Sequence, residues 1–344
     1  MLKNFINQVI VGENLSQSQA QEAMQVIMSG QAGDVQISAL LTALRIKGET
    51  SSEIAGFAQT MRDYAVKIDC DGKELIDTCG TGGDKKGTFN VSTTVAFVVA
   101  GAGLTVAKHG NSGVSSSCGS ADVLSALGIH VNLPPEAVGT MIKELNIGFL
   151  YAPSFHKAMK YAAKPRKELG FRTIFNLLGP LTNPANANCQ LIGVYDPVLT
   201  QTIGKALQEL GVRRAMVVHS FDGMDEISTL APTQVTEVRD AEIRSYIIEP
   251  ADYGFNSGVP EDYLGGTPED NAEIIIEILK GQKGAKRDIV LMNAAAALLV
   301  ADKAATLEEG LTIAAASIDS GAALAKLEGL RSASQRYKEE FSLS

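Results

Sequence analysis

Apolar residues in the first 67 positions recur every three or four residues, which is the spacing of amphipathic helices. The first helical face consists of Leu2, Phe5, Ile6 and Val9. Residues typical of helix starts and stops mark three further helices, over residues 16–30, 34–48 and 50–65. This part of the chain is therefore predicted to be a helical bundle.

The pattern changes after a polar link at residues 69–73. Short apolar runs then alternate with helical stretches from Leu75 to Gly128, which is the order expected of a parallel sheet with crossover helices. Later strands are predicted at 191–195, 215–219 and 245–248, and later helices at 134–145, 154–164, 267–281 and from 288 onward. The predicted fold class is α/β: a mostly parallel sheet with flanking helices plus a smaller all-helical domain.

Two loops rich in small residues follow the first two predicted strands. The sequence D-T-C-G-T-G-G-D at 77–84 follows Leu75 and Ile76, and K-H-G-N at 108–111 follows the strand predicted at 104–107. Neighbouring parallel strands end at the same edge of a sheet, so both loops would border one pocket. Backbone N–H groups of such loops bind anions, most often phosphate.

Lys108 would add a positive charge to that pocket. Each feature alone has a simpler interpretation, as an ordinary tight turn or as a solvated lysine. The place of Lys108 between an apolar strand and Gly110, and the repetition of the loop pattern, favour an anion site.

Composition narrows the possible functions. A length of 344 residues favours about two domains. The formal net charge of -9 argues against a nucleic-acid or anionic-membrane surface, although a phosphorylated substrate needs only a local positive pocket.

The most apolar stretches, 91–107 and 289–301, are too short or interrupted to span a membrane, and no signal peptide is expected. A reduced, cytoplasmic setting is predicted because metal-ligand and disulfide spacings are absent among Cys70, Cys79, Cys118 and Cys189.

Two further motifs lie downstream of the loops. They are P-R-K-E-L-G-F-R-T-I-F-N-L-L-G-P-L-T-N-P at 165–184 and G-M-D-E at 223–226. With these four motifs in order over nearly its whole length, the chain resembles the anthranilate phosphoribosyltransferase family of tryptophan biosynthesis. The resemblance implies a nucleoside phosphorylase/phosphoribosyltransferase-like fold. It also implies transfer of the phosphoribosyl group of 5-phosphoribosyl 1-pyrophosphate to the amine of anthranilate, giving N-(5-phosphoribosyl)anthranilate and pyrophosphate.

The resemblance also implies which residues bind each substrate. Anthranilate would contact Gly80, Asn111 and Arg166. Two magnesium ions per subunit would be held by Ser92, Asp225 and Glu226. Phosphoribosyl pyrophosphate would contact both loops and the helix starts that follow them: Gly80, Gly83, Asp84, Thr88, Asn90, Val91, Ser92, Thr93, Lys108, His109, Gly110, Asn111, Ser116 and Ser120.

This reaction needs charge stabilisation more than a strong base, because negative charge builds on the leaving pyrophosphate while the ribose carbon becomes cationic. Adjacent carboxylates such as Asp225 and Glu226 suit magnesium, with phosphate completing its shell, although a pair standing alone would indicate a solvated acidic turn. The predicted catalytic residues are Arg166, Lys108 and His109. A guanidinium can pair bidentately with the benzoate carboxylate, although a helix-end arginine is the simpler interpretation of Arg166 alone. His109 would assist proton removal or hydrogen-bond the substrate.

The predicted domains are discontinuous. Residues 1–70 with about 132–180 would form the helical domain, which carries the anthranilate side and the dimer contact. Residues 71–131 with about 181–344 would form the α/β domain, which binds phosphoribosyl pyrophosphate and metal. The resemblance implies a homodimer through the helical domain, and neither nucleic acid nor a membrane is an expected partner.

One departure from the family pattern stands in the second loop. Ser112 follows K-H-G-N where the family generally carries an arginine, and Ser117 with Cys118 stands where lysine followed by serine is common. A cation near the phosphates is therefore missing. This predicts weaker binding of phosphoribosyl pyrophosphate, or an altered version of the enzyme.

Two other function classes stay open on the sequence alone. A pyrimidine nucleoside phosphorylase shares the architecture and a related glycine loop, but it would use phosphate as substrate and would not need the Asp225–Glu226 pair or Arg166. A non-catalytic relative that binds nucleic acid is suggested only by Ser112, and the acidic balance of the chain opposes it.

Overall fold

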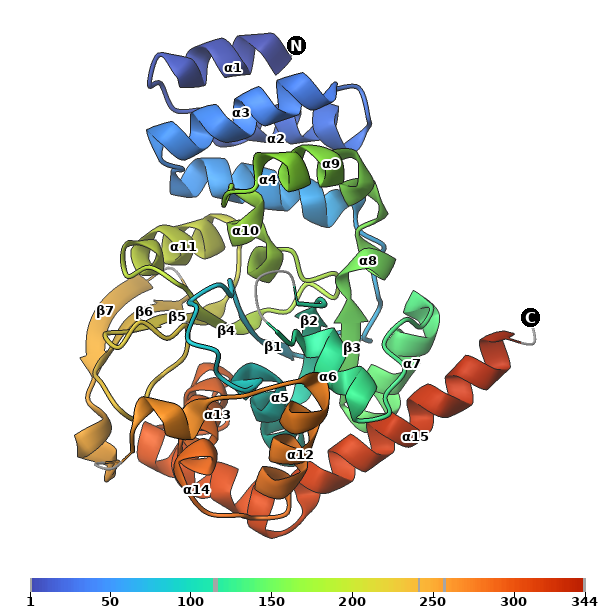
Figure 1. The fold of residues 1–344 in the computed structure, drawn as a ribbon, viewed down its shortest axis with the longest axis vertical. Helices are drawn as coiled ribbons and strands as arrows, with labels where there is room; N and C mark the ends of the chain where they lie inside the picture. Colours follow the sequence, from blue (N-terminus) through green and yellow to red (C-terminus); the bar gives the residue numbers. More distant parts are fainter. Residues whose placement is uncertain (1, 114–116, 241, 256–257, 343–344) are drawn as a thin grey trace.

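The computed structural model describes residues 2–113, 117–240, 242–255 and 258–342. Its N-terminal helices form the layer at the top of Figure 1: α1 (Leu2–Ile10), α2 (Gln17–Met28), α3 (Asp34–Lys47) and α4 (Ser51–Tyr64). The side chains of Ser16 and Thr50 accept hydrogen bonds from the first turns of α2 and α4, and Gly48 ends α3 with φ +88°. The predicted helical bundle is confirmed.

A seven-stranded sheet lies next to the helical layer, with the strand order β3-β2-β1-β4-β5-β6-β7. All pairs from β3 to β5 are parallel, whereas β6 and β7 are antiparallel at one edge. The strands are β1 (Leu75–Gly80), β2 (Thr105–Gly110), β3 (Ile147–Tyr151), β4 (Cys189–Gly193), β5 (Arg214–Ser220), β6 (Thr233–Arg239) and β7 (Glu242–Ile248). The predicted mostly parallel α/β sheet is confirmed.

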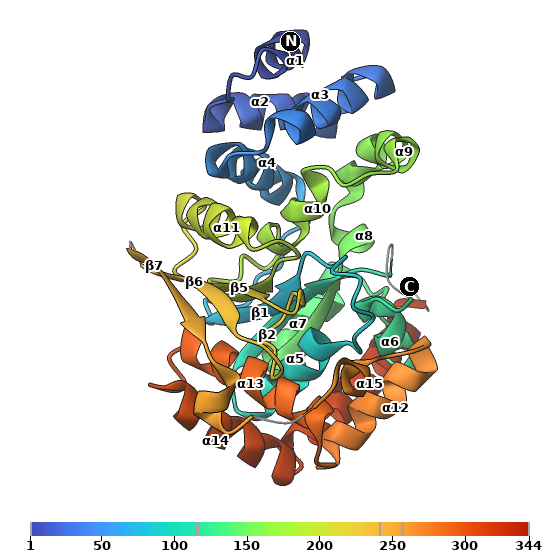
Figure 2. The same cartoon turned by 60° about the vertical axis from the view of Figure 1, so that its left-hand side comes forward.

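Helices cover both faces of this sheet. In Figure 2, α11 (Val198–Glu209) lies between α4 and the strands, whereas α5 (Val91–Gly101) and α13 (Ala285–Val300) lie on the opposite face. The other helices are α6 (Ser120–Ala126), α7 (Pro135–Leu145), α8 (Ala152–Phe155), α9 (Lys160–Leu169), α10 (Phe175–Leu178), α12 (Pro268–Leu279), α14 (Leu307–Asp319) and α15 (Ala322–Ser342). None of the helices in the described ranges is both long and apolar enough to cross a membrane.

Two apolar cores lie on the two faces of the sheet. Strand β5 contributes to both because its side chains alternate between the faces. Met216 and Val218 pack in the core beside α5 and α13, whereas Ala215 and Val217 pack in the core shared with the helical bundle. The bundle is thus joined to the sheet through a continuous apolar interior.

Strands β1 and β2 are longer than predicted. They continue through Gly80 and Gly110, so Lys108 and His109 lie within a strand rather than in a loop. Parallel pairing with β4 and β3 extends both strands beyond their last apolar residue. Polar residues in a buried strand carry no periodic signal, and the predicted strand ends are therefore wrong by several residues.

The prediction omits β3 and β6. Strand β3 pairs with β2, and both β3 and α7 pack in the core of the α/β part. The domain boundary predicted near residue 132 is therefore wrong for residues 135–151, because β3 completes the edge of the sheet. Helix α9, by contrast, packs against α2 and α3. The remaining division of the domains stays a prediction.

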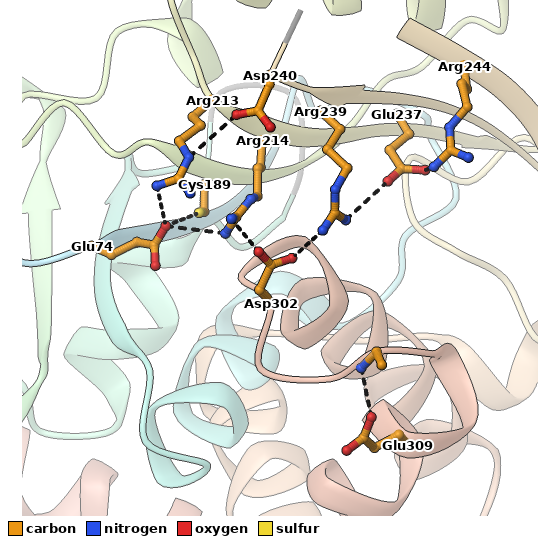
Figure 3. Close-up of polar contacts among 11 residues, drawn as sticks. Glu74, Cys189, Arg213, Arg214, Glu237, Arg239, Asp240, Arg244, Asp302 and Glu309 are labelled. Carbon is orange, nitrogen blue, oxygen red and sulfur yellow. Dashed lines mark hydrogen bonds and ion pairs between the residues drawn. The ribbon is translucent and has the colours of Figure 1, made fainter. Parts of the chain in front are cut away.

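A network of ion pairs joins the amino end of the sheet to the turn after α13 (Figure 3). Arg214, whose side chain is only 11% exposed, donates to Glu74 and to Asp302. Arg239 donates to the same Asp302 carboxylate at 2.8 Å. These pairs lie at the end of β5 opposite to the glycine loops, so we interpret them as part of the scaffold.

Candidate active site

The carboxyl ends of β1 and β4 approach the turn that carries Asp225 so closely that both strands end in glycine. A Cβ placed on Gly80 would lie 2.7 Å from Asp225 Oδ2, and one on Gly193 would collide with the Asp225 carbonyl oxygen. The Gly82 N–H donates to Asp225 Oδ2 at 2.9 Å. The structure therefore brings the first glycine loop and the G-M-D-E turn into direct contact.

Three carboxylates share this corner of the molecule. Burial, followed by the charge of Asp84, raises the pKa of Asp225 to about 7. Burial, followed by the charge of Asp225, raises the pKa of Glu226 well above its usual range. The Asp84 Oδ2 atom is buried and has no hydrogen-bond partner among the described residues. Among the described residues no three His, Cys, Asp or Glu side chains are gathered so as to hold a metal ion by themselves. The repulsion between these carboxylates is nevertheless a cost that a divalent cation would remove, which fits a magnesium site completed by phosphate.

Lys108 lies beside these carboxylates and is 3% exposed. Its ammonium donates to the Thr78 carbonyl and to Ser92 Oγ, the latter at 3.3 Å. Burial lowers the pKa of Lys108, while the charge of Asp77 opposes this shift most strongly. Lys108 is thus a buried cation fixed between β1 and the first turn of α5.

The N-terminus of α5 is tied to β1, through the hydrogen bond from Thr78 Oγ1 to the Ser92 carbonyl, and to the segment that leads into α6. Asn90 precedes the helix, its Nδ2 donates to the Cys118 carbonyl at 3.3 Å, and Val91, Ser92 and Thr93 form the first turn. The Thr93 hydroxyl is buried, and no residue in the described part of the chain forms a hydrogen bond with it. This is the arrangement that binds anions at helix N-termini.

A short segment after β7 braces the same loop. Thr88 forms an isolated bridge with Leu264, and the Phe89 N–H donates to the Tyr263 carbonyl at 3.1 Å. The loop between Gly83 and Asn90 is thereby fixed at its far end.

The second loop folds back on the N-terminus of α6. The Asn111 carbonyl accepts from Ser120 Oγ at 3.2 Å, while Asp122 Oδ2 accepts from Gly113 N at 2.7 Å and Gly119 N at 2.8 Å. The described part of this loop therefore has its own hydrogen-bonded frame. The predicted contact at Ser116 lies outside the described residues.

A buried network that the sequence interpretation missed positions His109. Asp77 Oδ1 accepts from the His109 N–H at 3.2 Å, and Asp77 Oδ2 accepts from Asn183 Nδ2 at 2.8 Å. Burial raises the pKa of Asp77 to about 6, opposed by the Lys108 charge. The sequence signal for this network is the carboxylate of Asp77 next to the apolar strand residues Leu75 and Ile76, because a buried carboxylate needs hydrogen-bond partners.

The side chain of His109 is held in one tautomer. Its Nδ1 lies 3.1 Å from the Gly179 carbonyl oxygen, so Nδ1 carries the proton and Nε2 carries the lone pair. Nε2 is buried and lacks a hydrogen-bond partner within the described ranges. Burial, and secondarily the charge of His156, lowers the pKa of His109 to about 3. At neutral pH His109 is a neutral acceptor.

His156 lies beside His109, with 5.1 Å between the ring centroids. Burial lowers the pKa of His156 to about 4. Its native pKa is below the unfolded value of about 6.5, so stability is complete above pH 6.5 and is lost as the pH falls towards 4. We expect the pH slope of the unfolding free energy to decrease by up to about 1.4 kcal/mol per pH unit in His156→Gln.

Denaturant titrations of both proteins between pH 4 and 7.5 measure this slope. The contribution of Asp77 cancels in the difference between the two proteins, whereas His109 loses only the secondary effect of the His156 charge on its pKa. Identical slopes would show that the pKa of His156 is the same in the native and the unfolded protein, against the burial described here.

Arg166 stands on α9, outside the two glycine loops, and its guanidinium lies 5.1 Å over the ring of Phe175. Burial lowers the pKa of Arg166. Phe175 begins α10, which leads directly to the Gly179 carbonyl that holds His109. Arg166 and His109 therefore flank the same short segment. Within the described ranges no salt bridge joins Arg166 to a carboxylate.

Arg172 is a second residue that the sequence interpretation missed. It donates to the Gly83 carbonyl, and its guanidinium lies 3.9 Å over the Tyr195 ring. Gly83 has φ +79°, which favours glycine. Arg172 thus ties the segment after α9 to the first glycine loop.

Family comparisons cover both parts of the chain. Residues 72–324 match the glycosyl transferase family a/b domain, and residues 3–65 match the glycosyl transferase family helical bundle domain. A relative from Moorella thermoacetica is 55% identical over 96% of this chain and 97% of its own length. One from Symbiobacterium thermophilum is 54% identical over 98% and 99%. Both are named anthranilate phosphoribosyltransferase.

Solved structures agree. The anthranilate phosphoribosyltransferase of Thermus thermophilus is 41% identical with a TM-score of 0.91, covering 96% of this chain and 99% of that protein. The Saccharomyces cerevisiae enzyme in complex with PRPP and Mg is 29% identical with a TM-score of 0.89, covering 97% and 98%. The same yeast enzyme with 4-fluoroanthranilate has a TM-score of 0.86 at 28% identity, covering 97% and 98%.

Proposed function

The chain belongs to the anthranilate phosphoribosyltransferase family, and we propose that the residues described above carry out the family reaction. That reaction transfers the phosphoribosyl group from phosphoribosyl pyrophosphate to anthranilate. A C–N bond forms between the amine and C1 of the ribose, the C–O bond to pyrophosphate breaks, and the amine loses one proton. The observation that carries the residue assignment is the contact of the first glycine loop with the Asp225 turn.

Pyrophosphate would be bound where charge stabilisation is strongest. The N-terminus of α5, the glycine loop and Lys108 supply donors and positive charge for it. Asp225 and Glu226, with Ser92, would hold magnesium, two ions per subunit, which neutralises charge on the leaving group. The raised pKa values of the carboxylates and the partnerless Asp84 oxygen fit this assignment.

Anthranilate would lie between His109 and Arg166. The Arg166 guanidinium would pair with the benzoate carboxylate, and Gly80 and Asn111 would border the ring. The lone pair of His109 Nε2 would accept a hydrogen bond from the amine. Since the pKa of His109 is about 3, this residue orients the nucleophile rather than acting as a strong base.

Loss of anthranilate fluorescence on addition of phosphoribosyl pyrophosphate and magnesium tests the proposed function. Excess chelator should abolish the change. Phosphorolysis of a pyrimidine nucleoside with inorganic phosphate would instead favour the phosphorylase. Salt-dependent DNA binding without turnover would favour the non-catalytic relative.

We also propose a homodimer through the helical layer. Four aliphatic residues of this layer are strongly exposed: Ile10 at 65%, Val11 at 71%, Val35 at 83% and Ile46 at 81%. Such exposure on one domain supports a protein contact there. The homodimer is tested by comparing the sedimentation of the parent protein with that of the variant Ile46→Glu. The predicted cytoplasmic location stays a prediction.

Replacing Ser112 by Arg is expected to tighten phosphoribosyl pyrophosphate binding about two- to fivefold, the scale of a partly exposed charge pair. Ser112 follows Asn111 in the second loop, and its N–H donates to Asn111 Oδ1 at 2.8 Å. An arginine there would add a guanidinium beside a loop that is already framed. Calorimetry at low and high salt measures the gain, which should shrink as screening increases. Weaker binding at low salt would show that this loop is adapted to serine.

A further inference from the structure

Two adjacent lysines in the first glycine loop play no part in the site as described so far. Lys85 and Lys86 follow Asp84 directly, and both are exposed. Lys85 has φ +62°, a left-handed conformation that is uncommon for residues other than glycine. The loop therefore carries two positive charges on a backbone shape that glycine would adopt at lower cost.

The Lys86 side chain lies across the turn that carries the carboxylates. A Cβ placed on Gly223 would be 2.9 Å from Lys86 Cε and 3.2 Å from its Nζ. Gly223 stands two residues before Asp225 in the G-M-D-E motif. At the other end, the Lys86 N–H donates to Asp84 Oδ1 at 3.2 Å. The ammonium of Lys86 is thus placed beside Gly223, in the turn that leads to Asp225 and Glu226.

Two cations that reach this loop from other elements are already committed. Lys108 is buried on the Thr78 carbonyl and Ser92, and Arg172 is stacked on Tyr195. Lys86 forms no salt bridge within the described part of the chain. It is therefore a cation with unused donors next to the loop that would receive a diphosphate.

We propose that Lys86 binds the diphosphate of phosphoribosyl pyrophosphate and supplies the positive charge that the second loop lacks at Ser112. This inference rests on the proposed function and extends it to a residue of this chain. An ammonium on a flexible stem can reach phosphate oxygens from beside Gly223 without entering the magnesium site. The left-handed turn at Lys85 directs the chain so that Lys86, rather than its neighbour, meets the carboxylate turn.

The test compares Lys86→Met with Lys86→Arg and with Lys280→Met, a distant exposed lysine at the end of α12. Lys86→Met should raise KM for phosphoribosyl pyrophosphate about two- to fivefold at low salt, with KM for anthranilate unchanged. The difference from the parent should fade at high salt. Lys86→Arg should restore binding, and Lys280→Met should match the parent.

Lys85→Gly removes the neighbouring charge and keeps the backbone conformation. It should change KM by less than Lys86→Met does. Equal losses would indicate a diffuse charge effect and would overturn a positioned contact. An unchanged KM in Lys86→Met would overturn the proposal outright.

A double-mutant cycle tests the link to Ser112. Ser112→Arg should improve binding more in the Lys86→Met background than in the parent, because the two cations would serve the same phosphates. If the effects of the two substitutions on binding were strictly additive, Lys86 and Ser112 would act independently, and the proposal that Lys86 replaces the missing cation would be refuted. An inactive parent protein would instead contradict the proposed function itself, so the two failures are distinguishable.

Discussion

Asp225→Asn and Glu226→Gln are each expected to lower kcat about a hundredfold or more, because magnesium stabilises several kcal/mol of transition-state charge and each 1.4 kcal/mol is a factor of ten. An amide keeps the size of each side chain but binds the cation weakly. Steady-state kinetics at saturating magnesium and phosphoribosyl pyrophosphate measure the loss.

The fold should survive these substitutions. Burial, followed by the charge of a neighbouring carboxylate, raises the pKa of both carboxyls, so removing one charge relieves a cost of the folded protein. The melting temperature without metal should therefore stay equal or rise. Glu273→Gln, an exposed carboxylate on α12, is the matched control and should leave both quantities unchanged. Full turnover in either site variant would remove that residue from the metal site.

The helical layer could be predicted from the sequence because its signals are local. Ser16 and Thr50 begin helices through side-chain caps that lie within three residues of the backbone groups they satisfy. Strand ends depend on partners far away in the sequence. Lys108 and His109 are in β2 only because β3, about 40 residues later, pairs with them.

The candidate site divides in the same way. The glycine loops and Asp225 carry motifs that can be recognised along the chain. Asp77 accepts a hydrogen bond from Asn183, which lies 106 residues away in the sequence. Arg172 donates to the carbonyl of Gly83, 89 residues away. Such contacts exist only after the sheet has formed. Lys86 lies outside the four sequence motifs, and its proximity to Gly223 arises only in the folded structure.

Arg166→Ala is expected to raise KM for anthranilate about ten- to a hundredfold, because a lost charge-assisted pair costs roughly 1.5 to 3 kcal/mol. KM for phosphoribosyl pyrophosphate should change by less than about twofold, since no phosphate contact is assigned to this guanidinium. Burial of Arg166 above Phe175 leaves its charge without a salt-bridge partner among the described residues, which suits a carboxylate ligand. Initial rates with each substrate varied in turn measure both constants.

Two controls separate substrate binding from a structural role of Arg166. Lys167→Ala removes an adjacent exposed charge on α9 and should leave both constants unchanged. Arg166→Lys keeps the charge but loses the planar pair of donors, so an intermediate KM is expected. Aniline, which lacks the carboxylate, should react poorly with the parent and no more poorly with Arg166→Ala. If the variant instead lost the same factor with aniline as with anthranilate, the guanidinium would be supporting α10 and its Gly179 carbonyl, and not the benzoate.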